Sequence, residues 1–366
     1  MHRVIQWGTG NVGYHSLRHL IRHPDLELVG VHAFSESKRG VDAADLCGLR
    51  DEVGATGVVA TNDIAALLSL GADAVVYTVN AETRPHEVVP ELARILASGA
   101  NVVSTSMIFL IYPPHADAWM REPLADACRK GDSTLYVNGI DPGFSGDVLP
   151  LAALQMADSV EEIRVQELCD YSSYEDPEFT GVSFGFGRAA DYQPPLGMPG
   201  VMTGAWGGMV RMIADALDIE LDEMRETFER CYAEEAFDTP MMHVAADTCA
   251  AVRFQIEGMA HGRPVVVTEH VNRLGNDIAP HWPQPPVGRA GVHRCIVTGN
   301  PSVQLECFVT GEDGDHNTGG VQATAMRVIN AIPAVCAHRA GLISTRDLPY
   351  TPSKNIRVNG PAQQVS

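Results

Sequence analysis

A few titratable side chains of this sequence could exchange a proton with a substrate. General acid–base chemistry uses His, Glu, Asp and Tyr groups whose pKa is adjusted by their surroundings. The candidates lie beyond residue 160: Glu167, Asp170, Tyr171, Tyr174, His243, Glu269 and His270. Glu269 and His270 are neighbours on a predicted strand, so they point to opposite faces and only one can face a cleft. We predict that His243, at the start of a possible helical turn, and Tyr171 are the catalytic pair.

Metal chemistry is not predicted. The eight cysteines are scattered without a CxxC pair, and the 14 histidines include no HExxH motif. Metal sites that can be read from sequence usually show such ligand spacing. We therefore expect no metal, and we expect reduced cysteines that mostly fill the core.

A glycine turn near the N-terminus predicts a binding site for a dinucleotide. The apolar run 4–7 leads into Gly8-Thr9-Gly10-Asn11-Val12-Gly13, and apolar residues then recur at helical spacing. In a strand–turn–helix unit, Gly8 permits the bend, Gly10 admits the pyrophosphate to backbone amides, and Gly13 allows close helix packing. The amides at the start of the helix attract the anion. We expect all six residues of the turn to contact the cofactor.

The end of the second predicted strand favours NADP, with NAD as the alternative. A carboxylate about 20 residues beyond the glycines typically holds the ribose hydroxyl of NAD, whereas hydroxyl and basic groups suit the 2′-phosphate of NADP. The strand 26–31 is followed by Glu36 but also by the groups that we expect to bind NADP, namely His32, Ser35, Ser37, Lys38 and Arg39. Glu36 is the one residue that argues for NAD.

The elements around the turn predict a Rossmann domain. Apolar runs at 58–60, 74–78, 101–104 and 134–137 alternate with helical patterns at 64–70, 86–98 and 115–130. This alternation is typical of a parallel sheet, which binds ligands beyond the carboxyl ends of its strands. We therefore expect further cofactor contacts from residues that follow the strands: Thr78, Asn80, Ser104, Thr105, Asn138 and Gly139.

The pattern changes from about residue 160. Strand 163–168, hairpins 248–274 and 292–309, and helices 205–217 and 222–231 predict an α+β domain with a mostly antiparallel open sheet. The aromatic segment 171–204 is expected to form a pocket wall or a subunit contact. We predict domains at 1–145 (Rossmann) and 146–320 (substrate and dimerisation), a C-terminal helix within 321–345, kinked at Pro333, that packs near the cofactor domain, and an extended tail at 346–366.

Composition limits the partners. The 26 basic and 46 acidic residues give a net charge of −20, so binding to nucleic acid or to an anionic membrane surface is not expected. The chain shows neither a signal peptide nor 18 uninterrupted apolar residues. We expect a soluble, cytoplasmic protein that acts on a small molecule.

Three motifs together identify a family resemblance. They are GTGNVG at 8–13, NGIDPGFSGDVLPL at 138–151 and GGVQATAMRVINAIPAV at 319–335. They resemble the 2,4-diaminopentanoate dehydrogenase and native amine dehydrogenase family, whose N-terminal half is similar to dihydrodipicolinate reductases. The resemblance implies a homodimeric two-domain enzyme that aminates ketones with NAD(P)H, or runs the reverse deamination. The HHxxKxDAPSGTA-type segment of true dihydrodipicolinate reductases is not found, so that activity is not expected.

One departure from the family concerns the substrate amine. The resemblance implies an acidic residue shortly before a Tyr-Pro pair, but here Ile108 and Phe109 precede Tyr112-Pro113. A buried cation without a counter-charge costs several kcal/mol. We therefore predict an NADP-dependent oxidoreductase that transfers a hydride to or from a C=O or C=N carbon of a rather apolar small molecule in the interdomain cleft. The predicted substrate pocket comprises Met107, Ile108, Phe109 and Phe144. The alternatives are an amine dehydrogenase and a non-catalytic NADP-binding or sensing protein.

Overall fold

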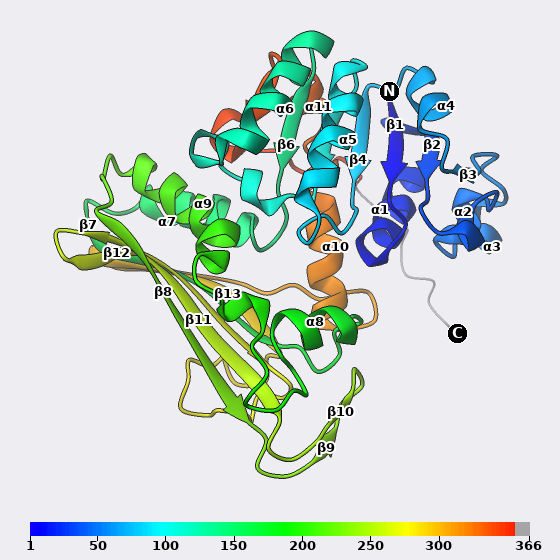
Figure 1. Cartoon of the computed structure of the whole chain (residues 1–366). Helices are drawn as coiled ribbons and strands as arrows, with labels where there is room; N and C mark the ends of the chain where they lie inside the picture. The colour runs from blue at the N-terminus through cyan, green and yellow to red at the C-terminus, as the bar shows by residue number, and fades with distance from the viewer. Residues whose placement is uncertain (356–366) are drawn as a thin grey trace, which may run out of the picture.

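The N-terminal domain is built on a seven-stranded parallel sheet. The computed structural model describes residues 1–355. The strand order is β15-β6-β5-β4-β1-β2-β3, and Figure 1 shows helices on both of its faces. The strands are β1 (His2–Trp7), β2 (Leu26–His32), β3 (Ala60–Thr61), β4 (Ala74–Tyr77), β5 (Asn101–Ser104), β6 (Thr134–Val137) and β15 (Gly341–Ile343). The order turns back on either side of β1 and β4, which is the doubly wound arrangement predicted from the alternating pattern.

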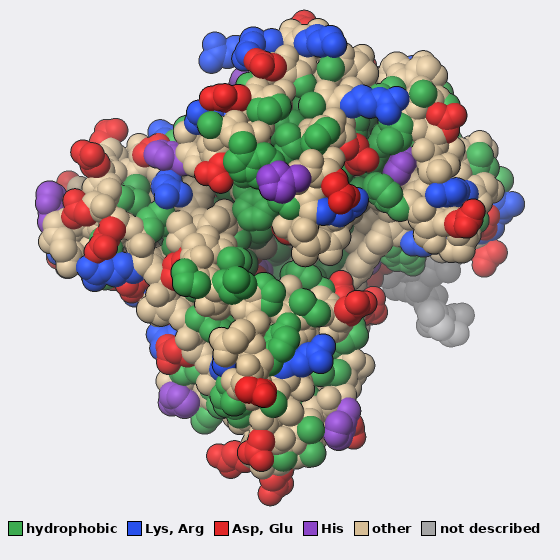
Figure 2. All heavy atoms as spheres, in the orientation of Figure 1, with side chains coloured by type: hydrophobic (Ala, Val, Ile, Leu, Met, Phe, Trp, Pro, Cys, Tyr) green, Lys and Arg blue, Asp and Glu red, His purple; other side chains and the backbone are tan. Residues whose placement is uncertain are grey.

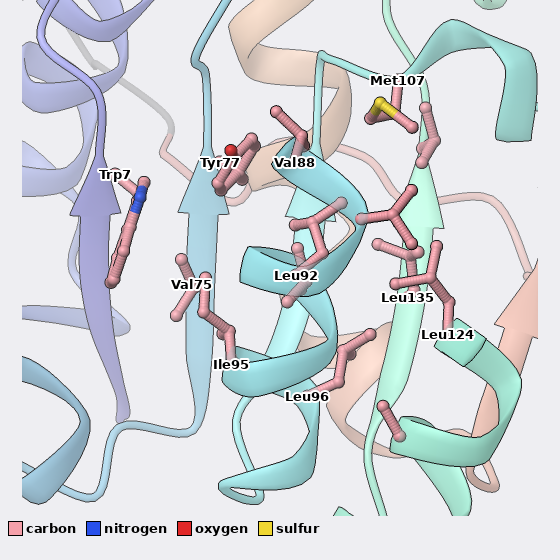
Figure 3. Packing of buried hydrophobic residues seen from close by; sticks show 14 of the residues in the cluster. Trp7, Val75, Tyr77, Val88, Leu92, Ile95, Leu96, Met107, Leu124 and Leu135 are labelled. Carbon is pink, nitrogen blue, oxygen red and sulfur yellow. The ribbon is translucent and has the colours of Figure 1, made fainter. Parts of the chain in front are cut away.

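The helices bury apolar stripes against this sheet. They are α1 (Asn11–Arg22), α2 (Ala43–Leu46), α3 (Arg50–Val53), α4 (Ile64–Ser69), α5 (Pro85–Ala97) and α6 (Ala118–Gly131). Figure 3 shows Val88, Leu92 and Ile95 of α5 pointing toward the sheet, where Val75 of β4 meets them. Leu92 and Ile95 are fully buried. Burying such a side chain contributes about 1.5–3 kcal/mol, so this layer holds the strand ends in fixed positions.

The end of the described chain returns to the N-terminal domain. The predicted C-terminal helix is two helices, α10 (His316–Ile329) and α11 (Ile332–Cys336), with Pro333 near the start of the second. Proline has no N–H and is tolerated in the first turn of a helix, which explains the break. Val328 and Ile332 pack with Val4 and Val76 on the face opposite α5.

The predicted tail is only partly an irregular segment. β15, which the sequence did not reveal, precedes it and pairs with β6. A short 3-10 turn, η6 (Thr345–Asp347), follows it, and residues 356–366 of the predicted tail lie outside the described range.

The second domain is a six-stranded, mostly antiparallel sheet. Its order is β14-β13-β7-β12-β11-β8, and the β7–β12 pair is parallel while its other pairs are antiparallel. The strands are β7 (Ser159–Asp170), β8 (Glu223–Tyr232), β11 (Cys249–Ala260), β12 (Arg263–Arg273), β13 (Gly291–Asn300) and β14 (Val303–Cys307). Both predicted hairpins are present, β11–β12 and β13–β14. The predicted boundary near residue 145 falls between β6 and α7 (Val148–Leu154).

Helices cover one face of this second sheet. They include α9 (Val201–Ala216), while α8 (Pro177–Ser183) lies in the aromatic segment 171–204. Phe184 and Phe186 of that segment are stacked and buried in the core of this domain. A small hairpin has strands of two residues each, β9 (Phe237–Asp238) and β10 (His243–Val244). Short 3-10 turns complete the fold: η1 (Glu36–Lys38), η2 (Ile108–Leu110), η3 (Pro113–His115), η4 (Phe144–Gly146) and η5 (Pro195–Gly197).

One predicted element is wrong. Residues 222–231 form the edge strand β8 instead of a helix. Met224 and Phe228 alternate with polar residues and pack on the core of the second domain, while the exposed residues between them face away. Among the described residues, no helix is both long and apolar enough to cross a bilayer.

Candidate functional site

The glycine turn is shaped to receive an anion. Gly8 has a φ of +98°, and a Cβ on Gly13 would lie 2.3 Å from the carbonyl oxygen of Gly8, so both positions require glycine. A Cβ on Gly10 would meet no atom within 4 Å. Gly10 is also the N-cap of α1, and no side chain caps it. The first amides of α1 therefore face open space that suits a pyrophosphate.

A cleft of about 680 Å³ opens in front of this turn. Thr9, Gly10, Asn11 and Lys38 line it on the side of the N-terminal domain, and Glu175 lies on the opposite side. Val12 turns away from the cleft toward the core. Figure 2 shows hydrophobic and uncharged atoms gathered around the waist between the two domains. The cleft lies at the carboxyl edge of the sheet, the position at which doubly wound folds bind a dinucleotide.

The loop after β2 gathers the groups predicted to choose the cofactor. The hydroxyls of Ser35 and Ser37 lie 2.9 Å apart, and Lys38 Nζ donates to the carbonyl oxygen of Thr9 at 2.5 Å. Arg39 lies 3.9 Å from Glu36 at the surface. Lys38 therefore stands beside the glycine turn, whereas Arg39 contacts its own loop through the carbonyl oxygen of Phe34.

His32 lies at the end of β2, but its ring is built into the core. It stacks on Trp7 with ring centroids 4.2 Å apart, and Phe34 meets it edge-on. Burial, with a smaller effect from Arg39, lowers the pKa of His32 to about 4. The ring is therefore neutral at neutral pH and braces the strand end.

Several predicted cofactor ligands turn their side chains into the protein. Thr78 accepts a hydrogen bond from Gln6 Nε2 at 2.8 Å, and the Ser104 hydroxyl donates to the carbonyl of Ser106 at 2.9 Å. Asn138 donates to Asp147 at 2.8 Å. These side chains hold the loops rather than line the cleft. The remaining predicted residues at the strand ends are Asn80, which is exposed, Thr105, which is half-buried, and Gly139, whose backbone packs on Thr324.

The loop after β5 forms an apolar wall held by an acid. Met107 is buried and has a φ of +62°, a conformation that a non-glycine residue adopts at a cost. Glu82 Oε1 accepts the Met107 N–H at 2.9 Å, which holds the loop in place. Ile108 and Phe109 are half-buried, and Phe109 lies against α9 near Gly204. Sequence reasoning did not identify Glu82, because its role depends on the spatial neighbourhood of two loops.

A buried cluster of titratable groups lies where the loop after β6 meets the second sheet. Asp141 and His270 approach within 3.4 Å, and His270 Nδ1 lies 3.6 Å from Glu167 Oε1. These three side chains are between 3 and 8 % exposed. Phe144, the last predicted pocket residue, follows Asp141 and packs on the core of the second domain.

Hydrogen bonds fix both carboxyl groups of the cluster. Trp206 Nε1 donates to Asp141 Oδ1 at 2.7 Å, and the Ser145 hydroxyl donates to Asp141 Oδ2 at 2.6 Å. Tyr171 and Asn272 each donate to Glu167 Oε1 at 2.8 Å. The two acids therefore have fixed orientations around His270.

The cluster shifts the pKa of each member. Burial raises the pKa of Asp141, and His270 only partly opposes this. Burial also disfavours the charge of Glu167, but His270, His293 and Tyr171 outweigh it and hold its pKa well below the usual range. For His270, burial acts to lower the pKa, yet Asp141 and Glu167 prevail and raise it. The geometry thus favours an ionised Glu167 facing an imidazolium.

Of the predicted catalytic pair, the structure brings only Tyr171 to this cluster. Tyr171 is half-buried and stacks on Tyr174, which lies beside Asn11 at the start of α1. His243 lies in the short strand β10 rather than in a helical turn. Its side chain is 63 % exposed and pairs with Asp238 at 2.7 Å. We therefore no longer consider it a candidate proton donor.

Glu269 and His270 face opposite sides of the sheet, as the strand alternation predicted. Glu269 accepts from Gln166 at 2.8 Å and from Arg253 at 2.9 Å on the side away from the cluster. Burial opposes its charge, but Gln166, Arg164 and Arg253 lower its pKa. Glu269 is therefore a structural ion-pair residue.

Two overlapping groups have the side-chain types of a metal site. The first group is Asp141, Glu167 and His270, and the second is Glu167, Cys169 and His293. In each group the possible ligand atoms lie within 4.8 Å of one another. However, Glu167 Oε1 already accepts two hydrogen bonds, and Trp206 and Ser145 occupy the oxygens of Asp141. We interpret the cluster as a hydrogen-bonded acid–base group.

Comparisons with known proteins point to one family. The family model described as "2,4-diaminopentanoate dehydrogenase C-terminal domain" matches residues 144–359. A Streptomyces virginiae protein named amine dehydrogenase is 38% identical over 352 residues, which cover 96% of this chain and 97% of that protein.

Solved structures share the fold. An amine dehydrogenase from Mycobacterium smegmatis has a TM-score of 0.77 at 19% identity and covers 96% of this chain and 97% of its own. An Agrobacterium radiobacter oxidoreductase solved with NAD+, L-tartaric acid and magnesium has a TM-score of 0.54 at 8% identity, with coverages of 93% and 90%.

Proposed function

The chain belongs to the 2,4-diaminopentanoate dehydrogenase family of NAD(P)-dependent oxidoreductases, and from this premise we propose that it is an NADP-dependent amine dehydrogenase. It interconverts a rather apolar ketone and ammonia with the corresponding amine, in the cleft between the two domains. The nicotinamide cofactor supplies or accepts the hydride. The side chains of this protein bind the nitrogen, orient the carbon and exchange the proton.

The observation that carries this proposal is the charge of the buried cluster. Asp141 and Glu167 are two buried carboxyl groups that share His270, with His293 also 4.0 Å from Glu167, and among the described residues neither acid forms an ion pair with Lys or Arg. The His270 imidazolium compensates Glu167, so the carboxyl group of Asp141, whose pKa burial raises, is the group that gains most from a further cation. An ammonium or iminium group of the substrate is such a cation. The acid that is missing at positions 108 and 109 is thus supplied from the second domain.

The walls of the site favour an apolar substrate. Met107 is buried in the core of the N-terminal domain, whereas Phe109 lines a cleft with Tyr112 and with Gly204 of α9. Apolar pockets with a few convergent polar groups are typical of small-molecule sites. In the reductive direction Tyr171 orients the nitrogen through its hydroxyl, and Glu167 stabilises the positive charge before the hydride arrives.

The preference for NADP rests on the loop after β2. Lys38 and Arg39 can neutralise a 2′-phosphate, and the Ser35 and Ser37 hydroxyls can donate to it. Measured dissociation constants of NADPH and NADH test this preference, and tighter binding of NADH would contradict it.

A second candidate function is the reduction of a ketone without ammonia. It is favoured by the wholly apolar positions 108 and 109, which lack the acid that the family resemblance implies. A panel of ketones with NADPH, measured with and without ammonium, separates the two candidates. Turnover that requires ammonium supports the amine dehydrogenase, and equal turnover without ammonium supports the ketone reductase. An amine dehydrogenase must also oxidise the corresponding amine with NADP+.

We also propose that the protein acts as a homodimer. The family resemblance supports this assembly, and one face of the second sheet carries Arg164, Arg253 and Glu269 in a fixed ion-pair network opposite the helices. Light scattering coupled to gel filtration tests the assembly, and a monomer at micromolar concentration would contradict it.

A further inference from the structure

Two histidines flank Glu167 in a row across the second sheet. The backbone register pairs Glu167 of β7 with His270 of β12 on one side and with His293 of β13 on the other. His293 Nδ1 lies 4.0 Å from Glu167 Oε2, and His293 is as buried as His270. Cross-strand neighbours share a face of the sheet, so one carboxylate bridges two imidazoles.

A third histidine continues the row toward the surface. Gly291 lies two residues before His293 on β13 and therefore faces the same side. A Cβ on Gly291 would lie 2.3 Å from Cε1 and 2.5 Å from Nε2 of His316. The His316 ring thus occupies the space of the missing side chain, beside His293. His316 is the first residue of α10 and is only partly buried.

The row contains nitrogens that make no hydrogen bond, although two of them lie near carboxylates. Among the described residues, His270 Nε2, His293 Nδ1 and His316 Nε2 are buried and make no hydrogen bond. A buried unsatisfied polar atom costs about 1–3 kcal/mol, so three of them in one row need an explanation. Histidine nitrogens that can gain or lose a proton at neutral pH are the usual elements of a proton shuttle.

We propose that His316 and His293 conduct a proton between solvent at the start of α10 and Glu167 at the reacting centre. This inference rests on the proposed function. In the reductive direction the hydride forms a new C–H bond, and the electron pair of the broken C=X π bond remains on the heteroatom. The heteroatom takes one proton from the group formed by Glu167, His270 and Tyr171. A proton from solvent then replaces it by way of His316 and His293.

The charged and titratable groups around the path come from three elements. Glu167 and Cys169 of β7 face His293, Cys307 of β14 is its backbone partner, and His316 lies beside it. Burial lowers the pKa of His316, and Glu167, Asp315 and Asp170 partly oppose it. The acids therefore offset part of the cost of placing a proton on this buried ring.

Three substitutions and one control test the path. H293Q and H316Q remove one shuttle group each, and Gly291→Ala displaces the His316 ring without removing any titratable group. H281Q alters an exposed histidine of the loop 275–290 and is the control. NADPH oxidation and proton uptake, followed by an indicator dye, are measured together in a stopped-flow instrument.

In the three variants of the path, we expect proton transfer to limit the rate of turnover. Each of the three variants should lose about ten-fold in turnover, less than the roughly 100- to 10,000-fold of a direct acid–base group, because these histidines act through Glu167. The loss should grow with pH, and added imidazole should restore part of the rate in H316Q. H281Q should match the wild type. The path would be overturned if H293Q and H316Q turned over within two-fold of the wild type with an unchanged pH profile. It would also be overturned if the wild-type protein bound one equivalent of zinc and the H293Q variant bound none.

The failure of the path is distinct from the failure of the proposed function. If the wild type turns over no ketone and no amine, the proposed function fails. The path is then tested by NMR titration of histidine side chains in the NADPH-bound protein, where E167Q must lower the protonation midpoint of His270. An unchanged midpoint would overturn the path.

Discussion

The substitution Glu167→Gln tests the charge of the site most directly. It preserves the shape of the side chain and an acceptor for Tyr171 and Asn272, but it removes the negative charge 3.6 Å from His270. At an effective dielectric constant near 20, the interaction of two unit charges at that distance is about 4–5 kcal/mol, or roughly three pKa units. His270 should therefore lose its raised pKa, and the substrate cation should lose one of its two carboxylates.

The assay is the oxidation of a substrate amine with NADP+, followed by the absorbance of NADPH. We expect kcat/KM to fall by about 100- to 1,000-fold, equivalent to about 3–4 kcal/mol of transition-state stabilisation. The matched control is Glu269→Gln, a buried acid on the neighbouring strand β12, which faces the opposite side and is held by Arg164 and Arg253. It should lower the melting temperature and leave kcat/KM within about three-fold of the wild type. If Glu167→Gln kept near-normal kcat/KM, or if Glu269→Gln lost as much at a temperature where it is folded, the assignment of the site would be wrong.

Three further predictions concern the cofactor domain. Gly10→Ala should melt at the wild-type temperature, because its Cβ meets no atom within 4 Å, yet it should weaken NADPH binding at least about ten-fold by intruding on the pyrophosphate; unchanged binding in calorimetry would refute this. His32 has a folded pKa of about 4, below its unfolded value near 6.5, so its contribution to stability is complete above pH 6.5 and is lost as the pH falls toward 4. His32→Phe keeps the stacking on Trp7 but cannot titrate. Between pH 6.5 and 4 the free energy of unfolding, measured with denaturant, should fall by roughly 2 kcal/mol less in this variant than in the wild type, after screening is allowed for. If the two proteins lost the same free energy over this range, another group would be responsible. The double variant K38A/R39A should weaken NADPH binding about ten-fold or more and NADH binding little, whereas equal losses for both would remove the loop from cofactor choice.

The sequence predicted the strand, glycine turn and helix that are present at residues 2–22 because their signal is local. Gly8, Gly10 and Gly13 lie in one turn, and the strands that position them have short, apolar patterns that differ clearly from the helices between them. The family resemblance rested on equally local motifs and was confirmed by the comparisons. What local patterns could not show was the direction of individual side chains, such as Asn138, which points to Asp147.

The reacting half of the site depends on contacts that are distant in sequence. Glu167, His270 and His293 become neighbours only through the register of three strands, and neither register nor strand order is encoded in a short window. The same limit explains β8, where Met224, Phe228 and Cys231 also fit helical spacing until pairing with β11 decides the structure. His316 was overlooked because its position depends on a side chain that Gly291 lacks.

The return of the chain to its first sheet has a consequence for synthesis and folding. β15 pairs with β6, and α11 packs on the core that begins with Val4, so the cofactor domain is completed by residues that emerge about 200 positions after the first six strands. During translation the nucleotide-binding half must wait, with one face and one edge uncovered, while the whole second domain is made. A nascent chain that stops before residue 315 would therefore expose the apolar face of this sheet to chaperones. Folding of the first 140 residues is completed only when the last 40 described residues pack on them.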